Sequence, residues 1–233
     1  VKYPCGQAEK RAVVFYLMSF ASKLISYLFH PIIMPAIAFV LVMDLGIEFV
    51  PFVTPDLKRK ILFYLIIPFT IYFPLSFLVM LRLSKNVSSF KVHTRQERIP
   101  LYIGTFIFYL AAYIFARSLT FSLPILVYSM MLGGVISLFL TTIITLKWKI
   151  SAHAIGISGV LGTLFATGEH IATYFYVIGD NPVFWPIINV TLLTGAISSS
   201  RLSLNAHTPA QIYAGLVVGF LSLYLPIKFL IVI

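Results

Sequence analysis

Long apolar runs constrain this chain more than any other feature of its sequence. Of its 233 residues, 60% are hydrophobic and only 10% are charged, whereas a soluble domain carries roughly 25% charged residues. A helix needs about 20 apolar residues to cross a hydrocarbon layer of about 30 Å. The sequence therefore predicts an all-α, polytopic membrane helical bundle with about six to seven transmembrane helices. The expected spans are residues 24–43, 61–81, 101–116, 121–146, 153–178, 183–199 and 211–233.

Composition narrows the remaining classes. No internal repeat, low-complexity tract or linker interrupts the chain, so residues 1–233 are expected to form a single integral membrane domain. The only cysteine, Cys5, excludes an intramolecular disulfide and a cysteine-based metal cluster. The formal charge of +10 is typical of basic loops near anionic head groups, so no nucleic-acid partner is expected. No pattern of a zinc protease, a prenyltransferase or an NTPase occurs.

A polar junction between two apolar runs, residues 200–211, predicts a helix start beside a histidine. The segment Thr208-Pro209-Ala210-Gln211 has the order of a capping box with proline at the first helical position. His207 then lies just before a helix N-terminus, which attracts anions and keeps a nearby imidazole neutral. Beside Arg201, such a histidine could attack a phosphate. Taken alone, this stretch is equally consistent with a polar loop at the head-group level.

Two further polar clusters are expected on the same side of the bundle. One is residues 91–100, which read Lys-Val-His-Thr-Arg-Gln-Glu-Arg-Ile-Pro, and the other is residues 150–153, which read Ile-Ser-Ala-His. From Arg98 the predicted chain crosses the membrane twice before Ser151, and twice again before Arg201. All three clusters therefore share one membrane face, although more than a hundred residues separate Arg98 from His207.

The side chains of the three clusters suit phosphate chemistry. The cationic donors that could stabilise a phosphoryl group in the transition state are Lys91, Arg98 and Arg201. His207 is the candidate nucleophile, and His153 is the candidate general acid for an alkoxide leaving group. Ser151 is expected to cap the helix that starts there and to bind a phosphate oxygen.

In order and spacing, the clusters resemble the three signatures of the type 2 phosphatidic acid phosphatase superfamily, which includes vanadium haloperoxidases. The first signature is Lys, six residues, Arg-Pro; Lys91 and Arg98 fit it, and one extra residue precedes Pro100. The second is Pro-Ser-Gly-His, which here reads Ile-Ser-Ala-His and keeps Ser151 and His153. The third is Ser-Arg, five residues, His, three residues, Asp; Ser200, Arg201 and His207 fit it, and Gln211 stands at the Asp position.

The resemblance implies a phosphatase-like core over residues 91–219, with a phosphohistidine on His207 and protonation of the leaving oxygen by His153. It also implies that no metal and no cofactor are needed. The residues that it implies for phosphate binding are Lys91, Arg98, Ser151, Ser200 and Arg201.

The glutamine at position 211 bears on the expected rate. A carboxylate there would fix the tautomer of His207 and stabilise its imidazolium, whereas Gln211 offers one amide oxygen and no charge, and the capping box competes for that oxygen. Loss of the corresponding carboxylate in a serine protease lowers the rate about 10⁴-fold, which is an upper guide here. We therefore expect a slower enzyme or assistance from another acid, for which Glu97 is a candidate.

Other polar residues receive structural interpretations. Glu169 and His170 would lie about 24 Å along the helix from His153, near the opposite interface, which favours a structural pair over a proton relay. His30 and His93 are expected at the membrane interface.

The sequence thus predicts a lipid phosphatase in the cell (inner) membrane, whose partner is a lipid phosphate substrate. A lipid phosphotransferase and a non-catalytic protein that binds or transports anionic lipid are the alternatives. The membrane face stays open. Twelve of the 17 cationic residues lie on the predicted site face and five on the other, which places the site in the cytoplasm. Bacterial relatives of the superfamily commonly act on the periplasmic leaflet.

Overall fold

A computed structural model of the chain describes residues 18–45, 53–90, 92, 94–175 and 181–230, and the regular elements within these ranges are all helices. Residues 18–28 form a first helical stretch. The elements that follow are η1 (Pro31–Ile33), α2 (Met34–Met43), α3 (Pro55–Ile61), η2 (Leu62–Ile66), η3 (Pro68–Tyr72), α4 (Phe73–Leu83), α5 (Arg95–Ser118), α6 (Ile125–Lys147), α7 (Ala152–Phe175), α8 (Phe184–Ser203) and α9 (Pro209–Leu230). The predicted all-α class is confirmed.

Five helical stretches are long and apolar enough to cross a membrane: Met18–Met43, Pro55–Leu83, Arg95–Ser118, Ile125–Lys147 and Pro209–Leu230. Each approaches or exceeds the length that a hydrocarbon core requires. Helices α7 and α8 are not among them, because polar side chains such as Glu169, Asn189 and Arg201 lower their hydropathy. Among the described residues the chain therefore has the helices of a polytopic membrane protein, with five candidate spans.

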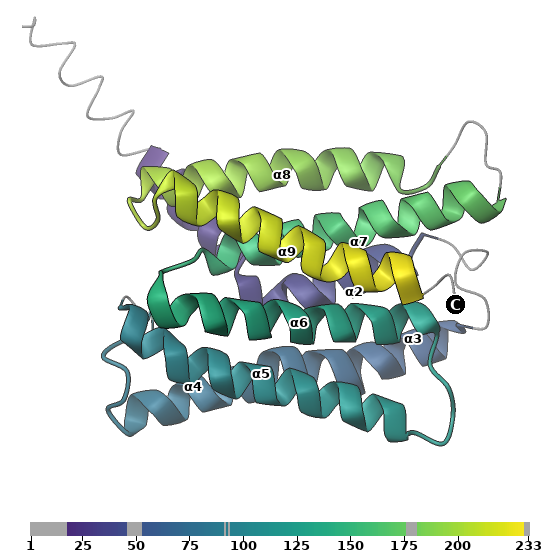
Figure 1. Cartoon of the computed structure of the whole chain (residues 1–233), viewed down its shortest axis with the longest axis horizontal. Coiled ribbons are helices and arrows are strands. Elements are labelled where there is room, and N and C mark those ends of the chain that lie inside the picture. The colour runs from purple at the N-terminus through teal and green to yellow at the C-terminus, as the bar shows by residue number, and fades with distance from the viewer. Residues whose placement is uncertain (1–17, 46–52, 91, 93, 176–180, 231–233) are drawn as a thin grey trace, which may run out of the picture.

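The helices lie side by side with their long axes roughly aligned (Figure 1). Helix α8 borders one edge of the bundle, and α4 and α5 border the other (Figure 1). The α4–α5, α6–α7 and α8–α9 connections all lie at one end of the bundle, on the left of Figure 1. The three polar clusters fall in or beside these connections, so the fold brings them to the same end.

Helices α7 and α9 form the most extensive helix pair. A Cβ atom on Gly219 would lie 2.1 Å from the carbonyl oxygen of Ile155, and one on Gly162 would lie 2.4 Å from the carbonyl oxygen of Phe220. Glycine at these positions lets the two backbones approach closely, as small residues do between helices in membranes. This pairing holds the start of α7 against the start of α9, where two of the polar clusters lie.

Capping residues start two helices earlier than hydropathy predicts. Helix α5 begins at Arg95 rather than near residue 101, because Thr94 and Glu97 form a complete capping box. As a result Arg98 lies in the first helical turn and not in a loop. Similarly, Thr54 caps α3 and Pro55 occupies its first position, so residues 55–60, which were expected in a loop, are helical.

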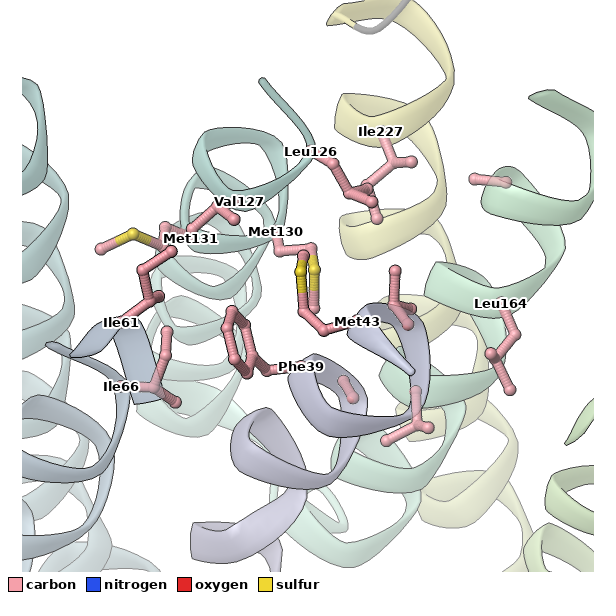
Figure 2. Packing of buried hydrophobic residues seen from close by; sticks show 14 of the residues in the cluster. Phe39, Met43, Ile61, Ile66, Leu126, Val127, Met130, Met131, Leu164 and Ile227 are labelled. Carbon is pink, nitrogen blue, oxygen red and sulfur yellow. The ribbon is translucent and has the colours of Figure 1, made fainter. Parts of the chain in front are cut away.

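The apolar core is centred on α2. Phe39 and Met43 of α2 are 2% and 1% exposed, and Figure 2 shows them beside Met130 and Leu126 of α6, with Ile227 of α9 above. Because α2 starts near the polar end and runs inward, this core lies away from the polar connections. The polar end is therefore supported by this packed apolar core.

Candidate active site

His207 and Gln211 form the centre of the site. The Nδ1 atom of His207 lies 3.0 Å from Oε1 of Gln211, and the same oxygen accepts a hydrogen bond from the backbone N–H of Thr208 at 3.3 Å. Since the Thr208 N–H can only donate, the amide atom that faces it is the oxygen. Nδ1 of His207 must then carry the proton, which leaves Nε2 with a free lone pair. One amide oxygen thus serves both the capping box and the histidine.

The capping box and the preceding turn fix where His207 lies. The N–H of Gln211 donates to Oγ1 of Thr208 at 3.4 Å, which completes the box predicted from the sequence. Asn205 adopts a left-handed φ of 49°, a conformation that asparagine tolerates well. In the same turn the N–H of Ala206 donates to the carbonyl oxygen of Arg201 at 3.1 Å. Arg201 and His207 are therefore held on either side of one tight turn.

Three cations gather around His207. Lys149 bonds to the carbonyl oxygen of Ala206, Arg201 begins the turn that leads to His207, and Arg98 bonds to Ile150, next to the Ser151 N–H that donates to the Gln211 carbonyl. The charge of each cation lowers the pKa of His207. Arg98 donates to the carbonyl oxygens of Val92 (3.1 Å) and Ile150 (3.4 Å). Its hydrogen bonds connect the cluster at residues 91–100 with the cluster at residues 150–153.

Lys149 connects the cluster at residues 150–153 with the polar junction at residues 200–211. Its Nζ atom donates to the carbonyl oxygen of Ala206 at 3.0 Å, immediately before His207. Burial lowers the pKa of Lys149, and the charges of Arg98 and Arg201 lower it further. A lysine whose charged form is disfavoured by neighbouring cations is suited to bind an anion.

No acidic side chain in the part of the chain that the structure describes neutralises the cationic group. Among the described residues, no ion pair involves Arg98, Lys149 or Arg201. Ion pairs among the described residues lie elsewhere, such as Asp44–Lys58, Asp56–Arg59, Asp56–Lys60 and Glu169–Lys228. Glu97 accepts from the backbone N–H groups of Ser88 (2.7 Å) and Thr94 (3.4 Å), so its carboxylate is used by the loop before α5.

The pKa of His207 is lowered from its usual 6.5 to about 4, chiefly because the side chain is buried. The hydrogen bond to Gln211 raises the pKa, and the three cations lower it. The neutral imidazole expected from the sequence is thus favoured, but burial is the main cause rather than the helix terminus. With its proton on Nδ1, neutral His207 has the form that a nucleophile requires.

The second histidine, His153, is held by the N-terminal helix. Its Nε2 atom lies 3.1 Å from the carbonyl oxygen of Ser26, and since a carbonyl only accepts, Nε2 carries a proton. The ring also lies edge-on to that of His30, with 5.6 Å between the ring centroids. Nδ1 is therefore the ring nitrogen that remains for exchange with a substrate.

Hydroxyl groups join residues 18–28 to the end of α8. Oγ of Ser22 lies 2.7 Å from Oγ of Ser203, and Oγ of Ser200 donates to the carbonyl oxygen of Ser22 at 2.6 Å. Ser26 Oγ lies 3.1 Å from Ser200 Oγ. It also accepts from Nη1 of Arg201 at 3.2 Å. We call Ser22, Ser26, Ser200 and Ser203 the serine ladder.

Not every predicted site residue reaches the cationic group. Ser151 is fully buried and accepts from the N–H of Ala154 at 3.4 Å, so it caps α7 as predicted. Ser200 points into the serine ladder, and its part in phosphate binding stays a prediction. Lys91 and His93 lie outside the described residues. Glu169 accepts hydrogen bonds from Tyr224 and pairs with Lys228 at 2.9 Å, two partners that the sequence interpretation did not name.

Sequence reasoning missed the contributions of Ser22, Ser26, His30 and Lys149. The first three recur at every fourth position, a spacing that places them on one face of a helix. This polar stripe within an apolar run was a usable signal. Lys149 lies just outside the cluster at residues 150–153 and was therefore not singled out from the sequence.

Comparison of the chain with models of known protein families, with characterised proteins and with solved structures gives no match. Within the described part of the chain, no group of three histidine, cysteine or acidic side chains could hold a metal ion.

Proposed function

We propose that this protein is a multi-pass membrane phosphatase that hydrolyses a phosphate or diphosphate monoester of a lipid. One observation carries the proposal: Arg98, Lys149 and Arg201 bond to, or begin, the segments that hold the buried His207, and no described carboxylate pairs with them. Like charges repel strongly where water is partly excluded. A phosphate with more than one negative charge is the ligand that relieves this repulsion. In addition, the buried Nε of Arg201 has no hydrogen-bond partner, which leaves one donor free for such a ligand.

The first step forms a phosphohistidine. Nε2 of His207 attacks the phosphorus with its lone pair, and the bond between phosphorus and the ester oxygen breaks. The three cations stabilise the charge on the phosphoryl oxygens. Throughout the step, Oε1 of Gln211 accepts the hydrogen bond from Nδ1–H of His207, which keeps Nε2 oriented toward the phosphorus. The leaving oxygen takes a proton from Nδ1 of His153, which is protonated only once the anionic phosphate is bound beside it, and the Nε2–H stays on the Ser26 carbonyl.

The second step regenerates the enzyme. Neutral His153 accepts a proton from water, and the water oxygen attacks the phosphorus. The bond between phosphorus and Nε2 of His207 then breaks and releases inorganic phosphate. The uncharged Gln211 stabilises the imidazolium character of His207 less than a carboxylate would, so we expect modest turnover.

The proposal includes a core like that of the type 2 phosphatidic acid phosphatase superfamily over residues 91–219, with seven spans in the cell (inner) membrane. Two observations support counting α7 and α8 as spans. Helix α7 packs against α9, itself a candidate span, and α8 packs against α7 (Figure 1). The site would then lie at the head-group level, where a lipid phosphate is its substrate and partner.

Phosphate release from lipid phosphates tests the proposal. We expect the purified protein in detergent micelles to release inorganic phosphate from at least one of phosphatidic acid, phosphatidylglycerol phosphate, undecaprenyl diphosphate and lipid A phosphates. The activity should persist in a metal chelator, because side chains supply the positive charge. His207→Ala should lower turnover by about 10⁴-fold or more. The control, His170→Ala, alters a histidine far along α7 and should keep the parental rate.

The same assay separates the alternatives. Transfer of the phosphoryl group from the lipid to an added alcohol, without release of inorganic phosphate, would indicate a phosphotransferase. Binding of lipid phosphates without either product, in both the parent and His207→Ala, would indicate a non-catalytic lipid-binding protein.

A further inference from the structure

A cavity of about 240 Å³ lies inside the bundle beside the candidate active site. Its walls come from α2, α4, α5, α6 and α7, with the π-helical turns η2 and η3 completing one side. An apolar cavity of about 150 Å³ is already large enough to bind benzene. The space is therefore sufficient for a ligand larger than a few waters.

One end of the cavity meets the site. His30, Pro31 and Ala152 line this end. The His30 side chain is exposed and its ring contacts that of His153. Ala152 lies between the two predicted site residues of its cluster. The cavity thus opens within one residue of the candidate general acid.

The other end lies in the apolar core. Phe39, Val127 and Met130 line it, and Figure 2 shows these side chains packed together between α2 and α6. Methionine adapts its shape readily because its side chain is unbranched. A chain that reached this depth would meet only apolar groups.

The lining offers almost nothing to a polar ligand. His30 is the only titratable side chain in it besides two tyrosines, and no acidic or basic residue is present among the described residues that line it. The hydroxyls of Thr70, Thr105 and Thr141 each donate to a carbonyl oxygen of their own helix, at 2.8, 2.8 and 2.6 Å. Such hydroxyls are already satisfied, so the wall that they present is apolar.

The shape of the cavity is that of a channel along the helices. Its lining on α5 extends from Leu101 to Ala112, which is about 16 Å at 1.5 Å per residue. This distance is roughly half of a hydrocarbon core of about 30 Å. The volume is below the roughly 300–1,000 Å³ typical of sites that enclose a whole drug-sized ligand, so one chain fits and two do not.

From these features we infer that the cavity binds one hydrocarbon chain of the lipid whose phosphate occupies the site at His207. The inference rests on the proposed function, and it narrows the substrate to lipids that can extend a single chain into the bundle. The chain passes His30 and Ala152 and runs along α5 toward Phe39. Burial of the chain anchors the ester oxygen between His153 and His207.

A photoreactive lipid tests this inference on the full chain in phosphatidylcholine nanodiscs. The probe is a long-chain alkylphosphonate, whose carbon–phosphorus bond the proposed phosphatase cannot hydrolyse, with a diazirine at the end of the chain, and peptide mass spectrometry maps the cross-links. We expect labelling in α2 and α6 at the depth of Phe39 and Met130. The same chain ending in a hydroxyl should label these peptides about tenfold less, because its head group lacks the anion.

Variants that fill the cavity provide the matched comparison. Thr105→Phe places a ring in the lumen and should reduce cavity labelling about tenfold, since excluding two methylene groups has this effect on affinity. Ser137→Leu fills it from α6 and guards against misfolding of the first variant. Ile107→Phe changes the same helix at a side chain that is 55% exposed, and labelling should persist.

Two outcomes would overturn the inference: labelling confined to outward residues such as Ile103 and Ile107, or equal cavity labelling by the hydroxyl probe, which would indicate a resident lipid. Failure of the proposed function would give a different result from failure of this inference. Phosphonate-dependent labelling of the cavity without any phosphate release would leave the chain site in place and remove the phosphatase. Phosphate release without cavity labelling would support the phosphatase and remove the chain-binding site.

Discussion

At the scale of single residues, the pair His207–Gln211 decides what the site can do. The amide oxygen of Gln211 selects the tautomer of His207 through a 3.0 Å contact but supplies no charge. Selecting the tautomer and stabilising the imidazolium are separate contributions of the carboxylate in a catalytic triad. This chain keeps the first contribution and lacks the second.

Titration of His207 follows from this arrangement. Histidine NMR in micelles should give a pKa of about 4 for His207, against a usual 6.5. Because the folded-state pKa is the lower one, the unfolded chain binds more protons in this range. The stability linked to His207 is therefore present above pH 6.5 and is lost as the pH falls toward 4. A midpoint near 6.5 for His207 would contradict its burial among cations.

Gln211→Asp should shift that pKa upward, because a carboxylate beside Nδ1 favours the imidazolium. If the missing charge limits the rate, turnover should rise as well. Gln211→Leu is the control, since it removes the oxygen and should lower turnover. A fall in turnover with Asp would show that the fit of the capping box matters more than the charge.

At the scale of elements, the N-terminal helix completes the site. Ser26 contributes twice: its hydroxyl accepts from Arg201, and its carbonyl oxygen holds His153. Hydropathy averages a segment and cannot report which face of it is polar. For this reason residues 24–28 were predicted only as the start of a span, and residues 18–23 were not included in any predicted span.

Ser26→Ala should therefore lower activity by leaving Arg201 without the hydroxyl that positions it. It keeps the backbone carbonyl and removes the hydroxyl that orients Arg201, a hydrogen bond to a charged group whose loss typically lowers kcat/KM by about 10- to 100-fold. Ser26→Thr should restore most of the activity, and thermal unfolding should change little in either variant. Ser118→Ala, which removes a hydroxyl that bonds within its own helix at the far end of α5, is the control. Equal effects of Ser26→Ala and Ser118→Ala would exclude a positioning role.

The boundaries of elements were predictable only where caps were considered. Thr208 and Gln211 were identified as a capping box, and the structure forms it. The equivalent pair Thr94 and Glu97 was overlooked, so α5 was expected to start several residues late. Because the helix starts early, Arg98 lies in the first helical turn of α5 rather than in an irregular loop.

At the scale of the whole molecule, connectivity made the site predictable. Counting crossings between apolar runs placed three distant clusters on one side, and the connections of the bundle do lie at one end (Figure 1). Which side chains meet there was less predictable, because contacts depend on helix rotation. The Lys149 ammonium donates to the carbonyl oxygen of Ala206, whereas the Ser200 hydroxyl donates to the carbonyl oxygen of Ser22.

The most direct test of the central claim is to trap the phosphoryl group on the enzyme. The purified protein would be mixed with a lipid phosphate that carries a radioactive phosphoryl group, quenched within milliseconds in alkali and digested. We predict an acid-labile, alkali-stable label on the peptide that contains His207, which disappears in His207→Ala and persists in His170→Ala. Turnover of the substrate with no label on that peptide, or with label retained in His207→Ala, would contradict the account.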